Sequence, residues 1–188
     1  MSIPTEPIGS IPRPKELMEA VQASAENRIT REELNARYAE AVEDTIQRFE
    51  ETGSPVITDG EQSKPSFATY PIHGASNLAS GGVTIRFADG HSRQLPQLVA
   101  GPFRYETYAS QYLQAAKKYA HKPVKQAVIS ASALSLLYPQ QGIQGYPREA
   151  FLEDLLNENE KDIRMSLQAG AHNVQVDFTE GRLVLKLD

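Results

Sequence analysis

The sequence predicts an α/β protein, in the form of an incomplete TIM-type (β/α) barrel of about five parallel strands with a β-hairpin insertion. Three observations predict it. Short β-branched runs alternate with amphipathic helical patterns, one segment has hairpin alternation instead, and no linker or repeat divides the 188 residues. Strands separated by helices imply a parallel sheet with right-handed crossovers. We therefore expect a single domain over residues 1–188, equivalent to the N-terminal half of a barrel that needs eight strands and roughly 250 residues.

Two helices are predicted near the start of the chain. Pro14 suits the first turn of a short helix that carries Leu17, Met18 and Val21. Thr30 and Glu33 have the spacing of a capping box at the start of a second helix. Gly53 is placed to end that helix. Its apolar face is predicted from residues at three- or four-residue spacing: Leu34, Tyr38, Val42, Ile46 and Phe49.

The remaining elements follow from the same patterns. A hairpin is predicted over residues 83–95, with Asp89-Gly90 as its turn. One later helix is expected around Tyr105 to Ala116, and a long one from Pro147 to Gly170. The expected parallel strands, in chain order, lie near residues 7–10, at 56–58, 97–102, 127–130 and 173–177.

Composition limits the possible functions. The net charge of −5 and the absence of a basic stripe argue against a nucleic-acid surface. The first residues do not form a signal peptide, and no apolar run is long enough to cross a bilayer, so a cytoplasmic protein is expected. The sequence contains no cysteine, which excludes disulfides and any thiolate metal ligand from this chain. A small anionic or zwitterionic substrate remains compatible with this composition.

Polar residues follow three of the predicted strands: Ser10 follows the first, Asp59 and Glu61 the second, and Asp177 with Glu180 the fifth. In a (β/α) barrel these positions line the catalytic face. A hydroxyl and carboxylates that converge there could hold the charged groups of an amino acid. The alternative is that Asp59 belongs to a turn and Asp177 caps the next element. The four histidines share no metal-ligand spacing, although His73 could reach the site from its loop.

Three segments together resemble one known family. Ile8-Gly9-Ser10-Ile11-Pro12-Arg13-Pro14 resembles the I-G-S-x-P-R/Q motif that opens the catalytic barrel of cobalamin-independent methionine synthases. Thr58-Asp59-Gly60-Glu61-Gln62-Ser63-Lys64 resembles the D-G-E-x-x-R segment of the shorter, single-barrel relatives. Val174-Gln175-Val176-Asp177 resembles the Q-x-D-E-P segment at the fifth strand, without the E-P that continues it. The order and spacing of the three segments also fit.

The resemblance implies a function and site residues. In that family a zinc ion holds the thiol of homocysteine as a thiolate, which takes a methyl group from a methyltetrahydrofolate. It implies that Ser10 and Glu61 hold the homocysteine backbone and that Asp177 binds its amino group. The family's zinc ligands, a His-x-Cys pair, a Glu and a second Cys, follow the fifth strand, and no counterpart occurs in this cysteine-free sequence. No cofactor is therefore expected in this chain, and we expect it alone neither to bind zinc tightly nor to methylate homocysteine.

Two hypotheses follow. The chain is a methionine-synthase-like protein that binds a small amino-acid or thiol substrate for methyl transfer. Alternatively, it is a catalytically inactive half-barrel that acts as a binding or accessory protein, or a truncated fragment of the enzyme. The absence of the zinc ligands favours the second hypothesis for the isolated chain. An open edge of a parallel sheet also predicts possible self-association, whereas nucleic acid and membranes are not expected partners.

Overall fold

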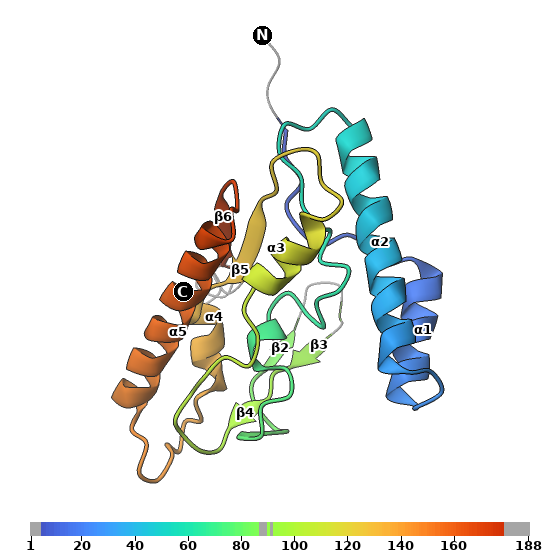
Figure 1. The fold of residues 1–188 in the computed structure, drawn as a ribbon. Helices are drawn as coiled ribbons and strands as arrows, with labels where there is room; N and C mark the ends of the chain where they lie inside the picture. Colours follow the sequence, from blue (N-terminus) through green and yellow to red (C-terminus); the bar gives the residue numbers. More distant parts are fainter. Residues whose placement is uncertain (1–4, 87–89, 91, 179–188) are drawn as a thin grey trace.

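The computed structural model describes residues 5–86, 90 and 92–178. Helices and strands alternate only in the C-terminal half, and the N-terminal part is helical (Figure 1). The helices are α1 (Lys15–Ala25), α2 (Arg31–Glu51), α3 (Ser110–Ala116), α4 (Ala131–Leu134) and α5 (Arg148–Gln168), with the 3-10 turns η1 (Tyr70–Ile72) and η2 (Ser135–Leu137). The strands are β1 (Leu78–Ala79), β2 (Thr84–Arg86), β3 (Ser92–Gln94), β4 (Gln97–Leu98), β5 (Gln126–Ile129) and β6 (Val174–Asp177).

The helices α1 and α2 form a helical hairpin on one flank of the molecule, and α5 lies on the opposite flank (Figure 1). The predicted capping box of α2 is confirmed: the Thr30 side chain accepts from the Glu33 backbone, and the Glu33 side chain accepts from the Thr30 backbone. Gly53, at φ +80°, follows the end of α2 as predicted. Of the apolar residues predicted on α1, Leu17 is buried, whereas Met18 is largely exposed.

The parallel part of the sheet consists of β5 and β6, which correspond to the fourth and fifth predicted strands. Their register runs from Gln126 opposite Val174 to Ile129 opposite Asp177. An isolated parallel bridge joins Ile57 to Val124, just before β5. The second predicted strand therefore lies directly beside the fourth.

The prediction of five parallel strands is wrong for the described residues. The segment predicted as the third strand, residues 97–102, contributes only β4, which pairs antiparallel with β1. The Asn77 side chain, more than 20 residues earlier in the sequence, donates to the carbonyls of Ala100 and Pro102, at 3.0 and 3.2 Å, and holds the segment beside β1. Residues 7–10 form no strand within the described structure.

Two further predictions concern the middle of the chain. The hairpin is confirmed, since β2 and β3 pair antiparallel from Thr84 opposite Gln94; Asp89 of the predicted turn lies outside the described residues. The helix predicted from Tyr105 begins only at Ser110. The backbone N–H of Ala109 donates to the side chain of Asp162 instead, so the preceding residues are held by α5 rather than by a helical turn.

The helix α5 contacts the rest of the protein through a stripe of carboxylates and an apolar face. Asp154, Glu158 and Asp162 are spaced by four residues, so they lie on one side of the helix. Each accepts a hydrogen bond from a tyrosine hydroxyl, supplied by Tyr146, Tyr108 and Tyr70 respectively. Beside this stripe, the buried side chains that form the main core come from η1, β4, β5, α4, η2, α5 and the segment before α3: Tyr70, Ile72, Leu98, Phe103, Tyr105, Ala109, Val128, Ile129, Ala133, Leu134, Leu137, Phe151 and Leu155.

Within the described part of the chain, no helix is both long enough and apolar enough to cross a membrane.

Candidate functional site

A tight reversal after Thr58 positions the central carboxylate of the site. Gly60 and Glu61 both adopt positive φ, at +63° and +55°. A Cβ on Gly60 would lie 2.8 Å from side-chain atoms of Ile11 and Thr45, so the reversal requires glycine there. Asp59 stabilises the turn, because its Oδ1 accepts from the backbone N–H of Glu61 at 2.9 Å.

Arg13 fixes the same reversal from the neighbouring segment. Its guanidinium donates to the backbone carbonyls of Glu61, Gln62 and Lys64. A planar guanidinium with several donors can bind such a cluster of carbonyls in one orientation. Two of the family-like segments are therefore in direct contact, since Arg13 belongs to the first and Glu61 to the second.

The carboxylate of Glu61 is buried and bound on both oxygens. Ser10 Oγ donates to Oε2, and the Lys64 ammonium lies 2.9 Å from Oε1. Lys64 Nζ also donates to the carbonyl of Ala127 in β5, at 2.8 Å. Each carboxylate oxygen has a second lone pair, so Glu61 keeps the capacity to accept from a ligand.

Asp177 lies at the end of β6, opposite Ile129 in the parallel pair. Its Oδ1 accepts from the Gln175 side-chain amide at 2.7 Å. Burial raises the pKa of Asp177 above its ordinary value of 3.8, the charge of Glu61 raises it further, and the charge of Lys64 opposes the rise. The structure thus brings Ser10 and Glu61 into contact and places Asp177 within electrostatic range of Glu61.

Lys64 was not recognised as a site residue from the sequence, and Asp59 was weighed as a turn residue. Asp59 does form the turn, but it is also buried, and its Oδ2 has no hydrogen-bond partner among the described residues. Burial raises the pKa of the Asp59 carboxyl. Lys64 could have been found from its position three residues after Glu61, where a basic residue also ends the D-G-E-x-x-R pattern.

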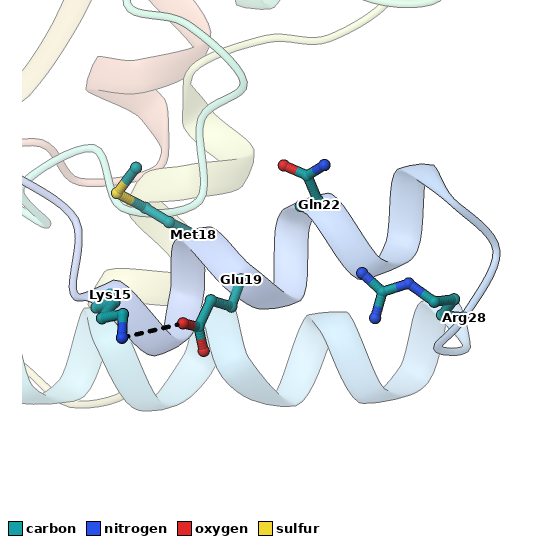
Figure 2. A pocket seen from close by; sticks show the side chains of 5 residues that line it. All are labelled: Lys15, Met18, Glu19, Gln22 and Arg28. Carbon is teal, nitrogen blue, oxygen red and sulfur yellow. Dashed lines mark ion pairs between the residues drawn. The ribbon is translucent and has the colours of Figure 1, made fainter.

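Neither the histidines nor the surface pocket on α1 adds to this site. His73 is exposed, and the described residues contain no group of three or more His, Asp or Glu side chains that could hold a metal ion. Figure 2 shows the pocket, where Lys15 and Glu19 form an ion pair along α1. None of its lining residues belongs to the predicted site: Lys15, Met18, Glu19, Gln22 and Arg28.

The raised pKa of Asp177 predicts a pH-dependent gain in stability for Asp177→Asn. A carboxyl with a folded pKa above its unfolded value contributes stability that is present below the unfolded pKa and lost as pH rises through the folded pKa. We therefore expect Asp177→Asn to be at least as stable as the wild type at pH 7, and to lose that advantage when pH falls below about 3.9. Urea unfolding of both proteins at pH 7 and below pH 3.9 measures the difference in free energy of unfolding between variant and wild type. The prediction is contradicted if this difference favours the variant less at pH 7 than at low pH.

The fold and the site together define the class of protein. It is an α/β protein in which Glu61 follows the parallel bridge at Ile57 and Asp177 ends β6, so both carboxylates lie where α/β sheets usually bind ligands. Residues 3–187 match the family described as cobalamin-independent synthase, catalytic domain. The chain therefore belongs to this family of methionine synthases.

Individual relatives agree with that assignment. The chain is 32% identical to a methionine synthase of Sulfolobus acidocaldarius, and 35% identical to one of Sulfurisphaera tokodaii, in each case over 68 residues that cover 36% of this chain and 20% of the relative. Among solved structures, a B12-independent methionine synthase from Shewanella sp. W3-18-1, in complex with selenomethionine, matches with a TM-score of 0.69 and 18% identity. A Listeria monocytogenes protein assigned as a vitamin-B12-independent methionine synthase matches with a TM-score of 0.71 and 21% identity.

The structural matches cover nearly all of this chain but only about half of each solved chain. Each structural match covers 93% of this chain but 51% of the solved chain. The chain thus spans about half the length of the solved structures that it matches. At 18% and 21% sequence identity, these structural matches support the fold of the chain alone.

Proposed function

We propose that the site at Ser10, Glu61 and Asp177 binds an α-amino acid with a thiol or thioether side chain, such as homocysteine or methionine, through its ammonium group. The observation that carries the proposal is the contact between Ser10 and the buried Glu61 carboxylate, at the strand ends where Asp177 also lies. The structurally similar Shewanella protein was solved in complex with selenomethionine, an α-amino acid whose side chain is the selenium analogue of a thioether.

The local charges favour a cationic group in the ligand. Glu61 and Asp177 influence each other electrostatically, and Asp59 is buried beside them. Lys64 is the buried cation that pairs with Glu61, and the charge of Lys125, which is also buried, acts on Asp177. Two ammonium groups do not balance three carboxylates, so a further ammonium, supplied by the ligand, would lower the electrostatic cost of keeping them ionised.

Methyl transfer requires more than an amino-acid site, because the family resemblance also implies a metal ion. The family resemblance implies a zinc site built from two cysteines, a histidine and a glutamate, whereas this sequence contains no cysteine and the described residues form no metal-binding cluster. The donors of this chain do not fit that site. We therefore propose amino-acid binding as the activity of the chain itself, and transfer of a methyl group from a methyltetrahydrofolate to homocysteine only where other residues supply the metal site.

Calorimetric titration with L-methionine tests the proposal. We expect the wild type to bind it and Glu61→Gln to bind it about tenfold more weakly or worse, because a hydrogen bond to a charged group is worth about 1.5–3 kcal/mol. Glu160→Gln is the matched control, since Glu160 is an exposed carboxylate on α5 that pairs with Arg164 on the helix surface. Its affinity should equal that of the wild type.

A ligand without the amino group makes the test specific to the ammonium. Des-amino methionine should bind the wild type weakly, and Glu61→Gln should not weaken its binding further. Equal affinity of the wild type for L-methionine and des-amino methionine would show that the carboxylates do not recognise an ammonium group.

A further inference from the structure

Lys64 is a buried cation whose ammonium group contacts three different groups of the protein. Its side chain is 1% exposed. Nζ lies 2.9 Å from Glu61 Oε1, 2.8 Å from the carbonyl oxygen of Ala127 and 4.5 Å from the centre of the Tyr70 ring. An ammonium has three N–H donors, and these contacts offer it a carboxylate, a carbonyl and an aromatic face.

These contacts separate the role of Lys64 from that of a ligand-binding residue. With its three N–H groups directed to protein acceptors and its side chain buried, Lys64 has no donor left for a substrate. Its effect on a ligand must therefore pass through Glu61. Ser10 donates to the other oxygen of Glu61 and is exposed, so Oε1 is held by a buried lysine, whereas Oε2 lies next to an exposed residue.

Lys64 also connects the two halves of the site. The bond to Ala127 ties the Glu61 reversal to β5, and β5 pairs in parallel with β6, which carries Asp177. The same ammonium charge lowers the pKa of the buried carboxyls of Asp59 and Asp162 and of the partly buried carboxyl of Asp177, against the larger effect of desolvation. A single buried cation therefore acts on carboxylates that come from different segments of the chain.

We propose that Lys64 is the positioning residue of the amino-acid site: it fixes the Glu61 carboxylate against β5, so that Glu61 and Asp177 face one ligand ammonium. This inference rests on the proposed function for the identity of the ligand, but not for the placement of Lys64. Its role is to orient Glu61 and not to contact the ligand.

A double-mutant cycle tests whether Lys64 acts through Glu61. Lys64→Met keeps most of the aliphatic stem and removes the charge; we expect L-methionine binding to weaken about tenfold or more in the wild-type background. In the Glu61→Gln background the same change should alter affinity by less than about twofold, because coupled residues are not additive. Lys122→Met is the matched control, since Lys122 donates to the carbonyls of Glu50 and Ser54 at another part of the fold.

A second readout does not need a ligand. A carbon-13 NMR titration of the Asp177 carboxyl should show its pKa higher in Lys64→Met than in wild type, and unchanged in Lys122→Met. If wild-type protein does not bind L-methionine, the proposed function fails, while this titration still decides the placement of Lys64. An unchanged pKa of Asp177 in Lys64→Met overturns the inference, as does equal loss of affinity in both backgrounds of the cycle.

Lys64→Arg covers the case in which Lys64→Met does not fold, as judged by circular dichroism. The D-G-E-x-x-R segment that residues 58–64 resemble has arginine at this position, so the guanidinium can keep the positive charge beside Glu61. We expect this variant to fold and to bind L-methionine within about threefold of wild type. A loss of about tenfold or more in folded Lys64→Arg would show that a cation at this position does not hold Glu61, and would overturn the inference.

Discussion

Asp162→Ala is expected to destabilise the protein by about 3–5 kcal/mol, because removing one partner from a buried charged network leaves the others unpaired. Asp162 has no exposed surface. It accepts the Tyr70 hydroxyl on one oxygen and the Ala109 N–H, at 2.7 Å, on the other. Because Asp162 is fully buried, water cannot replace these bonds, and the same burial raises the pKa of its carboxyl. Urea unfolding measures the loss.

The control for this prediction lies on the same helix. Glu160 is exposed and forms a surface ion pair with Arg164, so Glu160→Ala should change the free energy of unfolding by about 0.5 kcal/mol or less. Asp162→Asn should fall between the two, since the amide oxygen can still accept one of the two hydrogen bonds. Equal stabilities of Asp162→Ala and Glu160→Ala would mean that the carboxylate stripe of α5 does not hold the tyrosines.

Phe151→Ala is expected to cost about 3–5 kcal/mol through loss of apolar contact and the cavity that remains. Phe151 has no exposed surface, and its ring centre lies 5.3 Å from that of Phe103 and 5.2 Å from that of Tyr138. Through these rings α5 packs against the segment before α3, which carries Phe103, and against the residue after η2, which is Tyr138. Unfolding in urea, followed by tyrosine fluorescence, gives the free energy.

Leu156→Ala provides the matched control for the apolar face of α5. Leu156 is 60% exposed, so its truncation should cost about 0.5 kcal/mol or less. A similar cost for Phe151→Ala and Leu156→Ala would show that α5 is not anchored by its buried face.

Local patterns predicted the elements whose stability comes from their own residues. The Thr30–Glu33 capping box and the β2–β3 hairpin follow from short-range chemistry, and both are confirmed. The parallel partners β5 and β6 were also identified. The segment after residue 97 was misassigned because Asn77, distant in the sequence, binds its carbonyls and pairs it with β1. No periodicity in the chain contains that information.

The site shows the same division between local and distant causes. Ser10, Glu61 and Asp177 were predicted because each follows a predicted strand and matches a family motif. The contact between Ser10 and Glu61 emerges from the structure. The Tyr70–Asp162 pair spans 92 residues of sequence and could not be predicted. The buried state of Lys64 was equally hidden, because a lysine in a loop is most often exposed to water.

The most direct test of the account is a crystal structure of the protein with bound L-methionine. The proposed function predicts its ammonium nitrogen about 3 Å from carboxylate oxygens of both Glu61 and Asp177, with Ser10 beside it. Lys64 should remain on Glu61 and Ala127 without touching the ligand. An ammonium group bound away from Glu61 and Asp177, or a ligand seated in the surface pocket along α1, would contradict the assignment of this site.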